Sequence, residues 1–237
     1  MRIVAALALA VGLIVPAHAT PPRVVYVQEQ IAGQTKDAVF VFRRVTDNLG
    51  LHHQLWTDVE LIARDVQTGA ETGKWPVHSV LDSSAWFADY GESERTKDVT
   101  PDGRIDPFTV LAKRGAWEIM PGVRSWLVDR AKLSGDAIEI SDDGQTVTHR
   151  LTMADAIKRI TADVSAIESA LEERPTMGGG GVVALPPIDA SHCTIGDVHT
   201  FSLSIEPNRM GYAARLDCRD EDDLTSVQQY LVIPAAN

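Results

Sequence analysis

Runs of apolar and β-forming residues dominate the first half of the chain and predict strands. Residues 24–27 and 39–42 are short runs of this kind. Residues 55–63 and 75–81 flank a polar, glycine-containing stretch, which predicts a hairpin with a long loop. Because Pro76 lacks the N–H group that a strand ladder needs, the returning strand should lie at an edge or carry a bulge.

The middle of the chain combines a second predicted hairpin with short helical patterns. Residues 137–141 and 145–151 flank the turn sequence Asp-Asp-Gly at 142–144, which predicts the hairpin. Residues 108–112 and 123–132 show apolar positions at helical spacing. We therefore expect helical turns on both sides of the interruption by Pro121 and Gly122.

The clearest helical pattern covers residues 152–174. Thr152 followed by Asp155 is a variant of the capping box that begins many helices. The apolar positions then recur at spacings of three and four and form one stripe: Met153, Ile157, Ile160, Val164, Ile167 and Leu171. The stripe predicts that the helix docks on the protein's own sheet; pairing with a helix of a second chain is the alternative.

Glycine and proline content divides the chain after this helix. Four consecutive glycines make residues 176–187 a predicted linker. Before it, residues 20–175 form a mixed N-terminal region, and after it the alternating pattern of residues 188–237 predicts a small β unit. The expected fold class is α+β, with mainly antiparallel strands, one long amphipathic helix and this C-terminal unit.

The first nineteen residues have the three-part pattern of a secretory signal peptide. Arg2 supplies the positive charge, residues 3–15 are an uncharged and almost entirely apolar run, and small residues precede a cleavage site between Ala19 and Thr20. The pattern predicts an exported protein, periplasmic or extracellular. No second apolar run reaches spanning length, so no integral membrane segment is expected after the signal is removed.

Net charge and cysteine count narrow the picture further. The formal net charge of −11 opposes binding to nucleic-acid phosphates, so no nucleic-acid partner is expected. Cys193 and Cys218 are the only two cysteines. Their wide spacing does not fit a CxxC metal or redox pair, so a structural disulfide is predicted for an oxidising compartment. The chain-entropy relation gives such a loop about 3–4 kcal/mol of stabilisation.

One acidic segment resembles the first nine positions of the EF-hand calcium loop. Asp98, Thr100, Asp102 and Asp106 stand at oxygen-ligand positions, and a glycine stands at the turn position. Thr109 replaces the glutamate that completes such a loop, and two prolines interrupt it. A surface turn is the favoured interpretation and no cofactor is predicted; Ca²⁺ binding is the alternative.

The remaining chemistry-bearing residues form no recognisable catalytic motif. Asp189, Ser191, His192 and His199 are close in sequence, but no nucleophile elbow accompanies them, so no catalytic residue is assigned. The five tryptophans precede the linker, and core packing is favoured over ligand stacking for them: Trp56, Trp75, Trp86, Trp117 and Trp126.

These observations favour an exported, non-enzymatic binding or accessory protein of the cell envelope, with a protein partner or a small ligand. The alternative is a secreted hydrolase whose site assembles only in the fold. A deep polar cleft that brings a histidine to an acid and a serine would favour the enzyme. A shallow groove or an exposed apolar patch would favour the binding protein.

Overall fold

A computed structural model describes residues 22–50, 54–83, 96–118, 131–134, 136–141, 145–172, 188, 190–202 and 210–236. Over these residues the protein is mainly β. Twelve strands are accompanied by the helices α1 (Pro107–Arg114) and α2 (Met153–Glu172) and by a short 3-10 turn, η2 (Ala190–His192). The long helix is present, but strands far outweigh helices among these residues, so the expected α+β class is corrected to mainly β.

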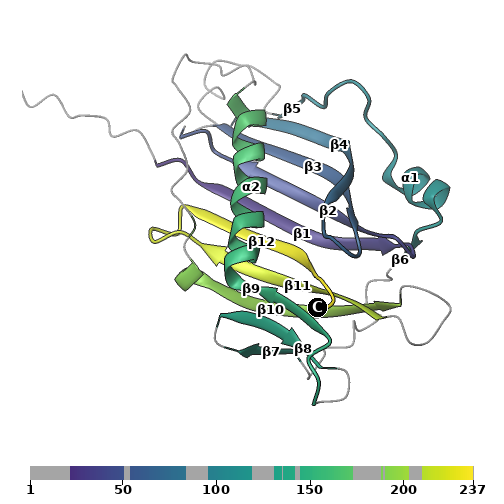
Figure 1. The fold of residues 1–237 in the computed structure, drawn as a ribbon. Coiled ribbons are helices and arrows are strands. Elements are labelled where there is room, and N and C mark those ends of the chain that lie inside the picture. Colours follow the sequence, from purple (N-terminus) through teal and green to yellow (C-terminus); the bar gives the residue numbers. More distant parts are fainter. Residues whose placement is uncertain are drawn as a thin grey trace, which may run out of the picture.

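A nine-stranded mixed sheet forms the body of the protein (Figure 1). Its order is β10-β11-β12-β1-β2-β3-β4-β5, and β6 also pairs with β1. All the pairs are antiparallel except β1 with β12, which is parallel. The strands are β1 (Val25–Gln34), β2 (Ala38–Asp47), β3 (Gln54–Asp65), β4 (Glu71–Ser83), β5 (Thr96–Asp98), β6 (Trp117–Glu118), β10 (Cys193–Ser202), β11 (Met210–Arg219) and β12 (Thr225–Ile233).

The C-terminal strands belong to this same sheet. Residues 188–237 were expected as a small β unit, and they do supply three consecutive strands. However, β12 hydrogen-bonds to β1 and so extends the sheet of the N-terminal region. Alternating side chains show that a segment is a strand, but not which distant strand it joins. The linker at 176–187 lies outside the described residues.

The predicted hairpin of β3 and β4 is present, but its loop is shorter than expected, because β3 continues to Asp65 and β4 begins at Glu71. The two strands pair antiparallel along most of their length. Pro76 lies opposite Glu60 beside a register shift at Val59, which confirms the predicted bulge.

A second, three-stranded sheet consists of β7 (Ala131–Ser134), β8 (Ala137–Ile140) and β9 (His149–Thr152). The predicted pairing of residues 137–141 with residues 145–151 is confirmed by β8 and β9, but β9 begins at His149 and residues 145–148 form no strand; the turn residues 142–144 lie outside the description. The helix expected for 123–132 is wrong at its end, since Ala131 and Lys132 belong to β7; residues 123–130 lie outside the description. A bridge between His149 and Ala235 joins the small sheet to the end of the chain.

Helix α2 docks on the protein's own sheet, as its apolar stripe predicts. The Thr152 hydroxyl accepts a hydrogen bond from the backbone N–H of Asp155 at 3.1 Å and so caps the helix. Ile160, Val164 and Ile167 are buried in a core cluster that includes residues of β1, β11 and β12. Figure 1 shows α2 crossing this face of the sheet.

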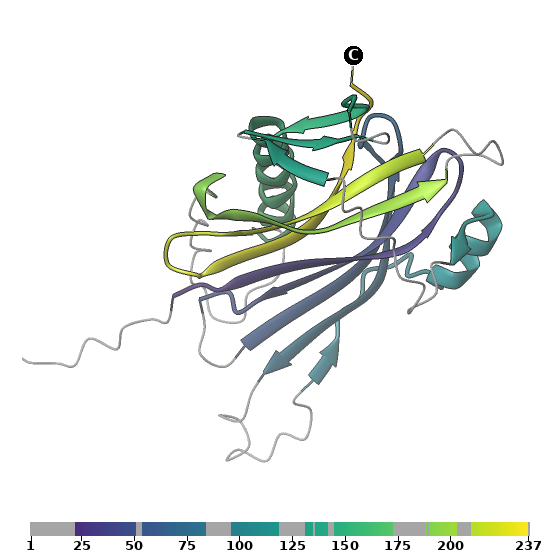
Figure 2. The ribbon, with the colours of Figure 1, turned by 90° about the horizontal axis from the view of Figure 1, so that it is seen from below.

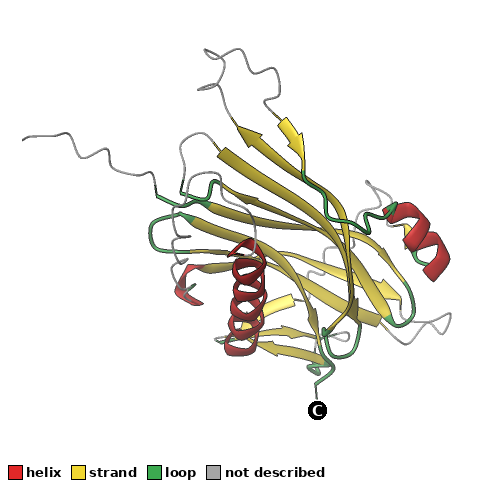
Figure 3. Ribbon diagram, turned by 90° about the horizontal axis from the view of Figure 1, so that it is seen from above, coloured by secondary structure: helices red, strands yellow, loops and turns green. Residues whose placement is uncertain are grey.

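Helix α1 lies on the opposite face of the sheet (Figures 2 and 3). Leu111 of α1 packs against Phe40, Leu61 and Ala63. On β2, Phe40 alternates with positions such as Val45, which belongs to the core beneath α2. Gly115 ends α1 in the left-handed region with a φ of 66°, which glycine adopts without strain.

Candidate functional site

A fork between the parallel strands β12 and β1 encloses a buried region with several charged side chains. β12 runs beside β1 only as far as the Gln28–Gln228 pair, and β6 pairs with β1 from Gly33 onward. In the gap, the carboxylate of Glu29 accepts the backbone N–H of Tyr230 at 2.9 Å, and Arg64 donates to the Tyr230 carbonyl at 2.8 Å. Two charged side chains thus satisfy backbone groups that a neighbouring strand would otherwise satisfy.

The Glu29 carboxylate is the centre of a buried ion network. Arg43 Nε donates to it at 2.9 Å, and both Nη atoms of Arg64 donate to it at 2.7 Å. All three side chains are buried: the exposed fraction is 0% for Glu29, 3% for Arg43 and 5% for Arg64. Burial alone would raise the pKa of Glu29, but the charge and hydrogen bonds of Arg64, with help from Arg43, hold that pKa below its ordinary value.

Helix α2 contributes the second carboxylate of the network. Asp163 Oδ2 accepts hydrogen bonds from Arg43 at 2.8 Å and from Arg64 at 3.2 Å, and also from the Gln229 amide. Two arginines therefore face two acids, so their charges balance. The network ties α2 to β1, β2 and β3, and its donors are directed at protein groups, so it acts as a structural anchor.

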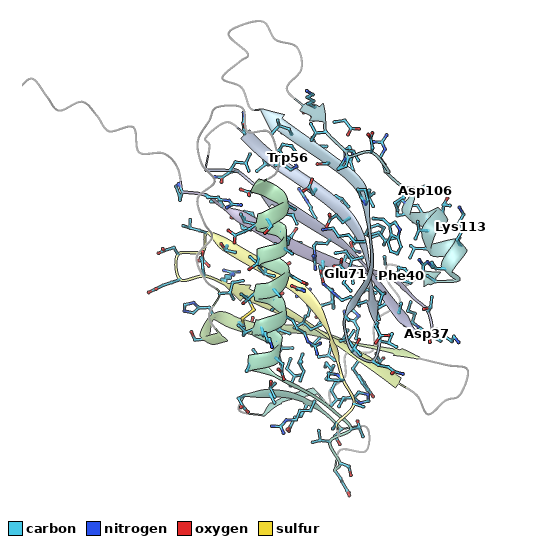
Figure 4. All side chains as sticks on the ribbon, turned by 45° about the horizontal axis from the view of Figure 1, so that its top comes forward. Asp37, Phe40, Trp56, Glu71, Asp106 and Lys113 are labelled. Carbon is cyan, nitrogen blue, oxygen red and sulfur yellow. A yellow bond between two sulfur atoms is a disulfide. The ribbon has the colours of Figure 1, made fainter. Side chains whose placement is uncertain are left out.

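The predicted calcium residues lie at the β5 end and the start of α1, and the structure brings only some of them together. Asp98, Thr100 and Asp102 line one open depression, with Arg104 among its other residues. Asp106 instead caps α1, accepting from the Phe108 N–H at 3.2 Å (Figure 4). The Thr100 hydroxyl and backbone N–H and the Arg104 guanidinium bind the Asp98 carboxylate and lower its pKa to about 2.

We expect titration of the purified protein with Ca²⁺ to give no binding heat and no rise in melting temperature. The reason is that Arg104, 2.9 Å from Asp98, already neutralises the carboxylate at the first ligand position. Isothermal titration calorimetry and thermal unfolding with and without Ca²⁺ provide the measurement. Heat that disappears in Asp98→Asn would contradict this expectation and support a calcium loop.

The predicted disulfide is confirmed. Cys193 and Cys218 are bonded to each other and stand directly opposite on β10 and β11. Cys218 is fully buried in the core beneath α2. The bond therefore fastens the outermost strand of the main sheet to its neighbour, and disulfides of this kind are typical of oxidising compartments.

His199 belongs to a polar cluster on β10, β11 and β12. Its Nε2 lies 3.1 Å from the Tyr230 hydroxyl. Nearby, Arg215 pairs with Asp197 at 2.8 Å and with Asp217 at 3.0 Å, beside a register shift in β10. Burial lowers the pKa of His199 and raises that of Tyr230, which in both cases favours the neutral form of the side chain.

The residues considered for hydrolysis do not converge with His199 among the described contacts. Ser191 and His192 are exposed on η2, whereas His199 bonds to Tyr230. A second histidine, His78, lies near a hydroxyl and an acid at an exposed site. Thr100 lies 3.4 Å from His78 and donates its proton to Asp98. That direction of donation does not activate the hydroxyl. Asp189 lies outside the description, and the hydrolase alternative stays a prediction.

Two of the five tryptophans can be placed with their surroundings. Trp56 is buried, and its indole N–H donates to Asp58 and Ser79 (Figure 4). Trp75 packs against the cluster beneath α1, with the Arg114 guanidinium 5.5 Å from its ring. For these two, the predicted packing role is confirmed. The side chains of Trp86, Trp117 and Trp126 lie outside the description.

The face of the sheet that carries α1 continues beyond that helix as a solvent-accessible polar surface. Cross-strand registers align Ser226, Tyr26, Thr46 and Thr57 in one row. The next row contains Gln228, Gln28 and Arg44. We call these seven residues the open face. Tyr26, Gln28 and Arg44 are exposed and the other four are partly exposed.

Arg44 is the only arginine or lysine among the seven residues of the open face. The same rows continue on β11 with Asp217 beside Gln228 and Arg219 beside Ser226, and both of these side chains are in ion pairs. The nearest neighbours of Arg44 across the strands are uncharged. Gln28 and Val59 lie directly opposite it on β1 and β3. No ion pair joins it to a carboxylate among the described residues. By contrast, Arg23, Arg43, Arg64 and Arg215 are all paired. Among the residues that the structure describes, the open face thus presents one cation without an ion-pair partner, beside amide and hydroxyl groups.

Comparison with protein-family models, with curated proteins and with solved structures gives no match. None of the described helices is long and apolar enough to cross a membrane. The signal peptide and its cleavage site at Ala19 and Thr20 lie outside the described residues. Function must therefore be argued from the site itself.

The ion network and the open face were both missed by motif reasoning, but the network leaves a signal in the sequence. Glu29 alternates in phase with the apolar residues Val25, Val27 and Ile31 of its strand. In the same way, Arg43 lies in phase with Val41 and Val45. A charge on the apolar face of a strand predicts a buried partner, because an unpaired buried charge is very costly.

Proposed function

We propose that the chain is an exported binding protein of the cell envelope and that its ligand lies on the open face. The observation that carries this proposal is the row of accessible hydrogen-bonding side chains across β12, β1 and β2, centred on Gln28 and Arg44. Amides and hydroxyls both donate and accept hydrogen bonds, so such a row suits a polar ligand. The sequence pattern of residues 1–19 and the disulfide support export.

The surrounding fold supports this role for the open face. The other side of the sheet is occupied by α2, whose apolar residues belong to the largest core cluster. Antiparallel strands that are covered on one side can leave the other side accessible to solvent. The ion network joins β1, β2 and β3 and holds these strands of the open face in a fixed register, which lowers the entropy cost of binding.

The proposal predicts that the envelope fraction of the native cell retains the purified exported protein through the open face. We expect the double variant Tyr26→Ala/Arg44→Ala to lose most of this retention, since it removes the exposed ring and the cation of the open face. Co-sedimentation with the washed envelope fraction, quantified against protein concentration, measures the effect.

The matched control is Lys158→Ala/Thr161→Ala, which alters two exposed residues of α2 on the other side of the sheet. This variant should be retained like the wild-type protein. Both variants change exposed or partly exposed side chains, so their stabilities should lie within about 1 kcal/mol of wild type. Equal retention of all three proteins would refute the proposed role of the open face.

A further inference from the structure

We infer that the open face binds a polysaccharide that carries carboxylate groups. This inference rests on the proposed function and names the chemical class of its ligand. It draws on three properties of the open face: an arginine that has no ion-pair partner among the described residues, a set of uncharged hydrogen-bonding groups, and an exposed tyrosine ring.

The charge of the open face selects an anionic group. The chain as a whole has a formal net charge of −11, yet the centre of this face carries Arg44 without a described carboxylate partner. A guanidinium group matches a carboxylate in geometry and can bind it through two parallel hydrogen bonds. One arginine binds one carboxylate group at a time, and the residues around it offer hydrogen bonds to uncharged groups of the same ligand.

The other side chains select sugar hydroxyl groups. Gln28 and Gln228 lie beside each other on the parallel strands, and Thr46, Thr57 and Ser226 continue the adjacent row. Because neighbouring strands are about 4.8 Å apart, four strands present such groups over about 15 Å. Tyr26, which is 45% exposed, lies at the centre of this array and offers an apolar ring against which a sugar can pack.

The shape of the surface argues against a peptide. Extended peptides are commonly recognised by pairing with a free strand edge or by filling an apolar groove. The open face lies on β12, β1, β2 and β3, all of which have neighbours on both sides within the sheet. Its residues project from the face of the sheet rather than from a strand edge, so a polysaccharide can lie across the strands.

The test is calorimetric titration of the intact exported protein with polygalacturonate oligomers, with dextran as a neutral polysaccharide and polyglutamate as an acidic peptide. We expect binding of polygalacturonate to exceed that of both others. Arg44→Gln should weaken it about tenfold to hundredfold, the range typical of a lost charged hydrogen bond. Arg44→Lys should restore only part of the affinity, because lysine retains the charge but lacks the planar fork.

Three results would overturn the inference: no binding of polygalacturonate, equal binding of dextran, or equal or tighter binding of polyglutamate. The control Lys158→Gln on α2 should leave the affinity unchanged. If polygalacturonate fails to bind while Tyr26→Ala/Arg44→Ala still abolishes envelope retention, the ligand class is wrong and the binding role stands. If that variant leaves retention unchanged, both the ligand class and the proposed function are refuted.

Discussion

Replacing Glu29 by glutamine is expected to lower the free energy of unfolding by about 3–5 kcal/mol, the usual effect of removing one partner of a buried ion pair. The substitution preserves the shape of the side chain but removes its charge. Arg43 and Arg64 would then share only the Asp163 carboxylate, which is 30% exposed. Urea unfolding at pH 7, followed by circular dichroism, measures the change.

The matched control is Gln30→Ala, at the neighbouring exposed position of the same strand. Its effect should stay within about 1 kcal/mol, because no described hydrogen bond of its side chain is lost. An equal loss of stability in the two variants would show that the strand position, rather than the ion network, causes the effect.

The same variant should change how stability depends on pH. Because the pKa of Glu29 is lowered in the folded protein, its charge stabilises the fold above the ordinary glutamate pKa of 4.5. That contribution is lost as the pH falls through the lower folded-state pKa. Glu29→Gln should therefore show a flatter decline in stability below about pH 4.5 than the wild-type protein.

Local patterns predicted most of the long strands and the long helix of this fold, but not its short strands β5, β6 and β7 or the long-range pairing of its strands. The stripe of α2 predicted its docking face, because burial of that stripe follows from helical periodicity. The parallel pairing of β1 with β12 joins Val25 to Thr225, residues far apart in the sequence. No local pattern encodes such a contact, so the C-terminal strands were predicted as a separate unit.

The candidate site was harder to predict than the fold. Each residue of the open face is an ordinary polar position on the solvent side of a strand. Only the registers of β12, β1, β2 and β3 bring Gln228, Gln28 and Arg44 into a row. The calcium pattern shows the opposite case: its spacing is local and visible, but Asp106 is used as a helix cap.

Removal of the disulfide by Cys193→Ala/Cys218→Ala is expected to lower the free energy of unfolding by about 3–4 kcal/mol. Most of this loss comes from the unfolded chain, which gains the freedom of a loop that was closed across a sequence separation of 25. Urea unfolding of the oxidised protein, the reduced protein and the double variant measures it. The reduced protein and the variant should have similar midpoints, both lower than that of the oxidised protein.

The number of steps in the urea-unfolding transition shows whether the C-terminal strands unfold together with the N-terminal region or as a separate unit. Since β12 pairs with both β11 and β1, weakening β10 and β11 should destabilise the strands of the N-terminal region as well. We therefore expect one transition, with tryptophan fluorescence and circular dichroism changing together, because the tryptophans precede the linker. A double variant in which circular dichroism changes in a first step, before any change in tryptophan fluorescence, would instead show that residues 188–237 unfold as an independent unit.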